Sequence, residues 1–363
     1  MGCMGTTWLS DREYLEEFHQ KAVQFRIPLS GSIELTHRCN LRCVHCYLGP
    51  EPAVDEAQKH EMDTHRVLSV IDEITDAGCL FLVLTGGEPL LRTDFAALYR
   101  HAKSNGLLVT VFTNGTLLTD SILDLFSDLP PHTVEITLYG ASAQTYEKIT
   151  GVKGSYDKCL KGIRRLLERN IDVRLKTILM SLNEHELLDM ESMAKECGVR
   201  FRFDAAIFPR FNGDKTPLSL RVSPEEAVEK ELSDSERLRQ WRDFLGRYRE
   251  LPASETLYTC GAGLTSFHID PHGNLMPCLM TVAHKFDLRN DAFLSVWNDA
   301  IARVREKRGE VDFVCNKCEN QIICGYCPAF FGLESGSEDV QSEYLCSMGK
   351  LRSLKIHRGA QGG

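Results

Sequence analysis

The spacing of its cysteines constrains this 363-residue chain more than any other feature. Most of the 14 cysteines fall into tight groups. Disulfide bonds explain such groups poorly, because a chain of this size without a secretory signal keeps its thiols reduced. Ligation of a metal or an iron–sulfur cluster is the better explanation. The candidate ligands are Cys39, Cys43, Cys46, Cys260, Cys278, Cys315, Cys318, Cys324, Cys327 and Cys346.

An alternation of strand and helix patterns indicates the fold class. Amphipathic segments with helical spacing separate short apolar runs, each of which suits a buried parallel strand. The runs lie at 32–36, 80–85, 107–112, 133–138, 173–179 and 199–205. Six successive βα units predict an α/β fold with a parallel sheet, and they are too few for a closed eightfold barrel. We therefore expect an open partial (β/α)6 TIM-like barrel, followed by a small cysteine-rich domain.

Changes in composition divide the chain into five segments. They are an N-terminal extension (1–31), the partial barrel (32–221), a helical linker (222–257), the cysteine-rich domain (258–349) and a tail (350–363). The linker is highly charged, and we expect its stripe of Trp241, Phe244 and Leu245 to dock onto the rest of the protein. The cysteine-rich segment has too small an apolar core to fold without metal centres.

The first cysteine group follows the first predicted strand with the pattern C-x3-C-x2-C. Three thiolates suit three irons of a [4Fe–4S] cube and leave the fourth iron for a small molecule. A zinc site completed by His37 or His45 is the alternative. The segment 86–89, Gly-Gly-Glu-Pro, follows the second strand. It should lie beside the cysteine group, because ligands bind at the carboxyl ends of parallel strands. Its glycines allow close backbone approach, and Glu88 offers a carboxylate to a positive amine.

This combination of C-x3-C-x2-C and GGEP resembles the radical SAM superfamily over roughly residues 32–206. The resemblance implies that Cys39, Cys43 and Cys46 hold a [4Fe–4S] cluster whose free iron binds S-adenosyl-L-methionine (SAM). It also implies that SAM contacts His45, Gly86, Gly87, Glu88, Pro89, Asn114 and Thr137. In such enzymes the reduced cluster cleaves SAM, and the resulting 5′-deoxyadenosyl radical removes a hydrogen atom from the substrate.

One departure from the family concerns the carboxylate of SAM. Many relatives hold it with an arginine after the fourth strand, where the nearest match here is Thr150. Lys176 on the fifth strand is an alternative cation, either for SAM or for the substrate. A lysine whose stem simply packs along a strand is an equally simple interpretation. The expected catalytic residues are Cys39, Cys43, Cys46, Glu88 and Lys176.

The order of the last seven cysteines resembles the SPASM domain of radical SAM enzymes that modify peptides and proteins. The resemblance implies auxiliary cluster II on Cys315, Cys318, Cys324 and Cys346, and auxiliary cluster I on Cys260, Cys278 and Cys327. With the SAM-binding cluster, that makes three [4Fe–4S] clusters. Auxiliary cluster I then has an open iron site.

Two further features of the cysteines bear on this assignment. A zinc ribbon on the 315–327 run is the alternative, but it leaves the other three C-terminal cysteines without a role. The spacing between Cys324 and Cys327 is two residues, whereas three is usual in the family. Cys79, Cys159 and Cys197 lie beside helix or strand patterns, and we expect them to be buried as small hydrophobic side chains.

The resemblance implies an oxidoreductase-type enzyme of peptide maturation, which installs a thioether or carbon–carbon crosslink in a ribosomally made peptide. The first alternative is radical modification or decarboxylation of a small molecule or a tetrapyrrole cofactor precursor. A sulfatase-type maturase is less favoured, because an aspartate is expected where Leu279 follows Cys278. An iron–sulfur scaffold without catalysis fits poorly with an intact GGEP segment.

The expected partners follow from charge and length. A net charge of −9 disfavours binding to nucleic acid. No run approaches the roughly 20 apolar residues that span a bilayer, so we expect a cytoplasmic protein without a membrane partner. Because the segment before the first strand is short, we expect no leader-binding domain there. A peptide substrate would therefore be recognised by the barrel or by a separate leader-binding protein. A flavodoxin or ferredoxin would supply electrons.

Overall fold

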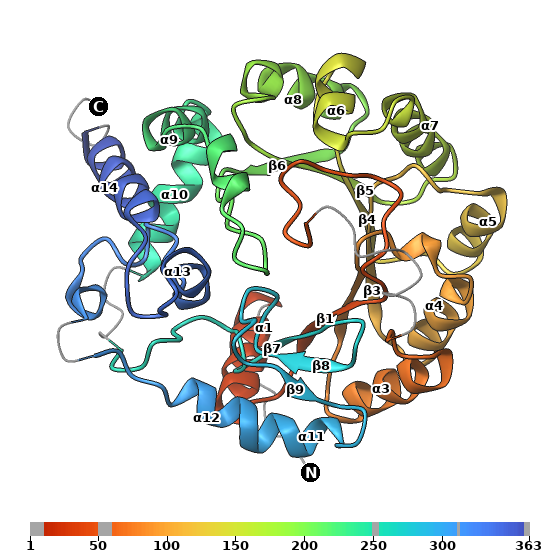
Figure 1. The fold of residues 1–363 in the computed structure, drawn as a ribbon, viewed down its shortest axis with the longest axis horizontal. Helices are drawn as coiled ribbons and strands as arrows, with labels where there is room; N and C mark the ends of the chain where they lie inside the picture. The colour runs from red at the N-terminus through yellow and green to blue at the C-terminus, as the bar shows by residue number, and fades with distance from the viewer. Residues whose placement is uncertain (1–10, 50–59, 249–253, 311–312, 359–363) are drawn as a thin grey trace, which may run out of the picture.

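The computed structural model describes residues 11–49, 60–248, 254–310 and 313–358. A single sheet with the strand order β6-β5-β4-β3-β2-β1-β7-β8-β9 runs through it (Figure 1). The strands are β1 Ser30–Glu34, β2 Phe81–Thr85, β3 Leu108–Thr113, β4 Thr133–Thr137, β5 Val173–Ile178, β6 Arg200–Asp204, β7 Ser266–Ile269, β8 Asn274–Met276 and β9 Phe286–Asp287. Strands β1 to β6 pair in parallel, as predicted, and their bounds lie within two residues of the predicted runs.

Helices cover the outer face of this curved sheet (Figure 1). They are α3 Thr64–Asp76, α4 Phe95–Ser104, α5 Asp120–Asp128, α6 Ala143–Thr150, α7 Ser155–Glu168 and α8 Leu187–Glu196. Strand side chains such as Ile33, Val111 and Ile136 are fully buried against them. Asp63, Thr119 and Ser142 cap three of the helices, each by accepting a backbone N–H. The result is the predicted partial α/β barrel.

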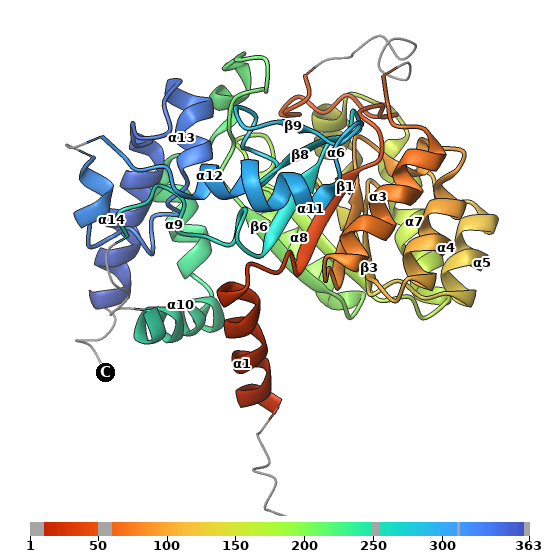
Figure 2. The same ribbon diagram turned by 90° about the horizontal axis from the view of Figure 1, so that it is seen from below.

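The remaining elements lie outside the six-unit barrel. They are α1 Asp11–Gln24, α9 Pro224–Leu232, α10 Ser235–Tyr248, α11 Phe293–Val296, α12 Ala302–Arg305, α13 Pro328–Ser335 and α14 Glu343–Arg358. Short helical turns are η1 Pro89–Leu91, η2 Glu184–Glu186, η3 Thr216–Leu220, η4 Trp297–Ile301 and η5 Val314–Lys317. Helix α1 projects from the body of the molecule (Figure 2). In the predicted linker stripe Trp241 and Leu245 pack against the core, whereas Phe244 is exposed.

A strand from the cysteine-rich segment extends the barrel sheet, which the sequence patterns did not predict. Strand β7 pairs with β1 in parallel, and β8 and β9 follow in antiparallel order. The Phe267 ring of β7 lies over Gly31 of β1, where an added Cβ would be 2.0 Å from the ring. The same ring packs against Phe293 and Trp297. The cysteine-rich segment is therefore joined to the barrel through its backbone and through an aromatic cluster.

Within the described ranges, no helix is long and apolar enough to cross a bilayer.

Candidate functional site

The loop that carries the first three cysteines follows β1 and is held by the end of α6. Arg42 N donates to Thr150 O at 2.8 Å, and Val44 N donates to Ile149 O at 3.0 Å. Burial raises the pKa of Cys39 to about 11, and the negative charges of Glu88 and Cys46 raise it further. Burial likewise raises the pKa of Cys43, and the charges of Cys46 and Cys39 add to this effect. The structure thus brings the three thiols together.

The glycines of the GGEP segment allow it to lie directly against this loop. Gly87 N donates to Thr36 O at 2.7 Å, and Glu88 N donates to Arg38 O at 2.8 Å. An added Cβ on Gly86 would be 2.4 Å from Thr36 O, and one on Gly87 would be 2.4 Å from Arg38 O. Gly86 also has φ +147°, which side chains rarely allow. No other residue type fits either position without moving the backbone.

The Glu88 carboxylate points into the protein and is fully buried. It accepts hydrogen bonds from Thr113 Oγ1 at 2.8 Å, Asn114 N at 2.7 Å and Leu90 N at 3.1 Å. Burial raises its pKa to about 7, against the effect of these donors. Three of the roughly four acceptor positions of a carboxylate are therefore occupied by the protein itself. Glu88 thus braces the ends of β2 and β3, a role that sequence reasoning missed. Its predicted contact with the amine of SAM stays a prediction.

Asn114 links this brace to the cysteine loop. Its side-chain amide donates to Asn40 Oδ1 at 2.8 Å and lies 3.8 Å from Cys39 Sγ. Asn40 in turn donates to Thr116 Oγ1 at 2.8 Å. The loop after β3 is thereby fixed beside the first cysteine thiol. Asn40 was also missed from the sequence, although its position directly after Cys39 is the signal that could have revealed it.

The residues predicted to lie near adenine and ribose follow β1 and end β4. His45 packs edge-on against Tyr139, with ring centroids 4.9 Å apart, and Tyr139 hydrogen-bonds Cys43. The His45 Nδ1 atom is buried and has no hydrogen-bond partner among the described residues. Burial lowers the pKa of His45 to about 4, so the ring is neutral near pH 7. Thr137 is the last residue of β4, two positions before Tyr139.

Thr150, the nearest match to the family arginine, is fully buried, and its hydroxyl lies 2.9 Å from the Ser155 hydroxyl. It therefore cannot replace a cation. Lys176 on β5 faces the other side of the sheet from the buried core and pairs in register with Thr137. Its ammonium lies 3.4 Å from Glu135 Oε2 and 3.0 Å from the centroid of the Phe112 ring.

The charges around Lys176 do not balance. Arg202 Nη2 donates to the same Glu135 oxygen at 2.8 Å, so one carboxylate serves two cations. Burial lowers the pKa of Lys176 to about 7, Glu135 opposes this effect, and Arg202 adds to it. Sequence reasoning missed Glu135 and Phe112, although the alternation of residues along β3 to β5 places them on the same face as Lys176.

The seven C-terminal cysteines separate in space into two groups. In one group, burial raises the pKa of Cys324 to about 12, and the charges of Cys346, Cys318 and Cys315 raise it further. In the other group, burial raises the pKa of Cys327 to about 12, and Cys278 and Cys260 add to this effect. The two sets have the same members as the predicted ligand sets. The assignment of a cluster to each set stays a prediction.

The donor set suits an iron–sulfur cluster. The cysteines that the structure describes are all free thiols. Within each group, an ionised thiol raises the pKa of its neighbours, and a positively charged iron centre would favour the thiolate form of all of them. In the described part of the chain, no three His, Cys, Asp or Glu side chains lie close enough to hold a single metal ion.

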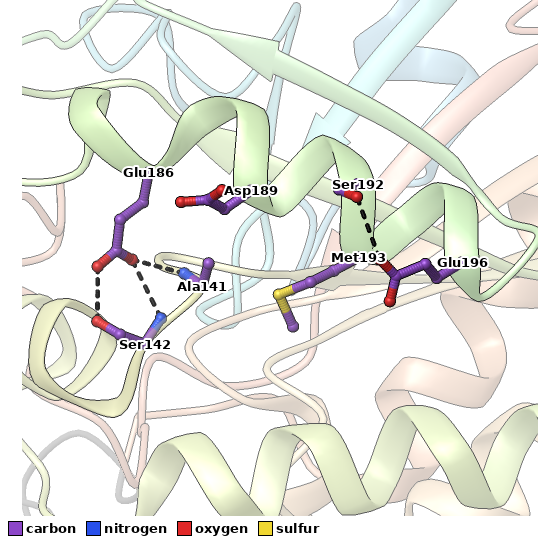
Figure 3. A pocket seen from close by; sticks show the side chains of 7 residues that line it. All are labelled: Ala141, Ser142, Glu186, Asp189, Ser192, Met193 and Glu196. Carbon is purple, nitrogen blue, oxygen red and sulfur yellow. Dashed lines mark hydrogen bonds between the residues drawn. The ribbon is translucent and has the colours of Figure 1, made fainter.

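Two other parts of the structure play no part in this site. Figure 3 shows a surface hollow outside the barrel, where the Glu186 carboxylate accepts from Ala141 N at 2.6 Å and Ser142 N at 3.1 Å and so caps α6. Among the other cysteines, Cys79 and Cys159 are buried as expected. Cys197 is exposed, and its expected burial was wrong, because it ends α8 at the surface.

Comparison with known proteins identifies the class. Residues 33–197 match the Radical SAM superfamily. The AdoMet-dependent heme synthase of Methanosarcina barkeri is 25% identical over 82% of this chain and 90% of its own length. The antilisterial bacteriocin subtilosin biosynthesis protein AlbA of Bacillus subtilis is 25% identical over 92% of this chain and 73% of its own length. The structure of Streptococcus suis SuiB bound to its precursor peptide SuiA matches with a TM-score of 0.68 at 16% identity, covering 95% of this chain and 83% of SuiB.

This chain therefore contains a radical SAM domain at residues 33–197, and the family implies that it binds SAM and a [4Fe–4S] cluster. Its fold is that of SuiB, including the region that follows the barrel.

Proposed function

We propose that this enzyme installs a crosslink, thioether or carbon–carbon, in a ribosomally made peptide. The observation that carries the proposal is the separation of seven C-terminal cysteines into a group of four and a group of three. The similarity to AlbA, a bacteriocin biosynthesis protein, supports it, because that similarity covers the cysteine-rich segment as well as the barrel.

The roles of the individual residues belong to the same proposal. Cys39, Cys43 and Cys46 would hold the SAM-binding cluster, which with SAM supplies a carbon radical that removes a hydrogen atom from the substrate. Glu88 would keep GGEP against the cysteine loop, and Asn114 would orient Cys39. The neutral His45 leaves a buried ring nitrogen for SAM. Lys176 would bind an anionic group of SAM or of the substrate.

The C-terminal groups would hold auxiliary clusters I and II, which brings the total to three [4Fe–4S] clusters. Three thiolates cannot close a cube, so Cys260, Cys278 and Cys327 would leave one iron open. A cysteine thiolate of the peptide suits that position chemically. The proposal also places the partial barrel at residues 32–221 and the auxiliary-cluster domain at residues 258–349. A separate leader-binding protein would recognise the peptide, and a flavodoxin or ferredoxin would supply electrons.

A second candidate function is radical modification or decarboxylation of a tetrapyrrole or another cofactor precursor. The similarity to heme synthase, which covers most of both chains, favours it. Lys176 and Arg202 would then bind a propionate carboxylate in place of an acidic group on a peptide. The sulfatase-type alternative stays less favoured, because Leu279 follows Cys278 where an aspartate is expected.

Co-expression tests the two candidates directly. The chain is produced with each short reading frame encoded beside its gene, and the peptides are analysed by mass spectrometry. The peptide proposal predicts the loss of two hydrogen atoms per crosslink. Loss of carbon dioxide from added iron coproporphyrin, with every peptide unchanged, would favour the tetrapyrrole candidate. A variant with Cys39, Cys43 and Cys46 replaced by alanine is the control.

A further inference from the structure

Tyr326 lies where the two C-terminal cysteine groups meet. It belongs to the two-residue segment between Cys324, which is in the group of four, and Cys327, which is in the group of three. This segment is the one that departs in length from the usual three-residue spacing. The tyrosine side chain is half-buried.

The contacts of Tyr326 reach the segments that lead into both groups. Its hydroxyl donates to Leu257 O at 2.8 Å, three residues before Cys260. Its ring lies 6.2 Å from the ring of Phe313, two residues before Cys315, and 5.6 Å from that of Phe331 in α13. The ring is thus fixed by a hydrogen bond on one side and by aromatic packing on the other.

Apolar packing brings this side chain together with thiols of both groups. Tyr326, Cys278 and Cys327 pack against one apolar cluster, and Cys315 belongs to that cluster. The ring therefore lies among cysteines of the group of four and of the group of three.

We propose that Tyr326 is a positioning residue that couples the two auxiliary clusters, because its ring fills the space between the two cysteine groups and excludes water from it. This inference rests on the two-cluster proposal above. The ring gives an electron a path through packed protein as it passes from one reduced auxiliary cluster to the other, oxidised one. No bond forms or breaks in that step. The hydroxyl only anchors the ring at Leu257.

The test uses the full-length chain with its clusters reconstituted. Tyr326→Leu removes the ring but keeps the site apolar, and Tyr326→Phe keeps the ring but removes the hydrogen bond to Leu257. Flash photoreduction with a deazaflavin delivers less than one electron per chain, and freeze-quenched EPR follows its redistribution between the two auxiliary clusters. Redistribution should slow several-fold in the leucine variant and stay near the wild-type rate in the phenylalanine variant.

Tyr99→Leu is the matched control. Tyr99 is a buried tyrosine of α4 whose hydroxyl also donates to a backbone carbonyl, Leu129 O at 2.6 Å, outside both cysteine groups. It should lose stability without changing the redistribution rate.

Two results would overturn the inference. One is a wild-type redistribution rate in Tyr326→Leu with its full iron content. The other is loss of iron from both Tyr326 variants, which would assign the residue to folding of the ligand sets. The iron content of the wild type, measured first, separates this failure from that of the two-cluster proposal. Peptide co-expression tests the peptide function independently.

Discussion

Glu88 is the side chain whose role changes most between sequence and structure. Replacing it with glutamine puts an NH2 group where a carboxylate oxygen now accepts a hydrogen bond. At least one buried donor among Thr113, Asn114 and Leu90 then loses its partner. We expect a loss of about 1–3 kcal/mol in the free energy of unfolding, and weaker SAM cleavage because Asn114 adjoins Cys39. Anaerobic urea unfolding and a 5′-deoxyadenosine assay measure the two effects.

The pH dependence of Glu88→Gln gives a second check. Burial raises the pKa of Glu88 to about 7, above its value in the unfolded chain, so ionisation opposes folding. The stability of the wild type relative to Glu88→Gln should therefore fall as pH rises through the range up to about 7, and then stay level. Glu186→Gln is the control, because hydrogen bonds from Ser142 and Thr145 outweigh burial and lower the pKa of Glu186. The difference in free energy of unfolding between the wild type and Glu186→Gln should not change between about pH 6 and pH 8.

Substitutions at Lys176 can decide whether its ammonium binds SAM or the substrate. Lys176→Met should leave 5′-deoxyadenosine formation intact and reduce conversion of the substrate if the ammonium binds the substrate. A drop in SAM affinity would instead place SAM at this cation. Burial lowers the pKa of Lys176 to about 7, so the wild type loses the charge as pH rises through that value. In Lys176→Arg the charge persists, and the decline in binding above pH 7 should disappear.

At the scale of elements, the contact between GGEP and the cysteine loop requires a residue without a Cβ at position 87. A Cβ on residue 87 would meet the carbonyl oxygens of Arg38 and His37, which are backbone atoms with no freedom to rotate away. Gly87→Ala should therefore displace the loop, with a loss of about four irons and of SAM cleavage. Iron analysis and the 5′-deoxyadenosine assay measure this outcome.

Gly246→Ala is the matched control for that substitution. An added Cβ at position 246, in α10, meets nothing within 4 Å. That variant should keep its irons and gain up to about 1 kcal/mol in stability from its higher helix propensity. Full iron content in Gly87→Ala would show that the GGEP contact does not support the cysteine loop.

The elements also show what sequence patterns can and cannot predict. Strands β1 to β6 were predictable because short strand patterns alternate with amphipathic helices, although β6, Arg200–Asp204, consists of alternating charged and aromatic residues. Strand β7 was not, because Ser266–Ile269 is short and its partner β1 lies far away in sequence. The orientation of Glu88 was hidden for a similar reason. Its donors Thr113 and Asn114 lie at the end of β3 and directly after it, and only the folded sheet brings them to Glu88.

For the whole molecule, the iron content tests the proposed ligand sets. Three [4Fe–4S] clusters predict about twelve irons per chain after anaerobic reconstitution. Replacing Cys39, Cys43 and Cys46 with alanine should leave about eight irons and abolish 5′-deoxyadenosine formation. Cys327→Ala should instead spare SAM cleavage and stop product formation. Zinc in the anaerobically purified wild type would contradict the cluster assignment at every group.

The pairing of β1 with β7 has a consequence for how the chain is made. During synthesis β1 emerges early, whereas β7 follows more than 200 residues later, since Ser32 and His268 are 236 residues apart. Until then, one side of β1 presents unpaired backbone groups, the kind of edge on which chains aggregate. A chain truncated within α10 would leave that edge uncovered. We therefore expect such a truncated chain to aggregate more readily than the full-length protein.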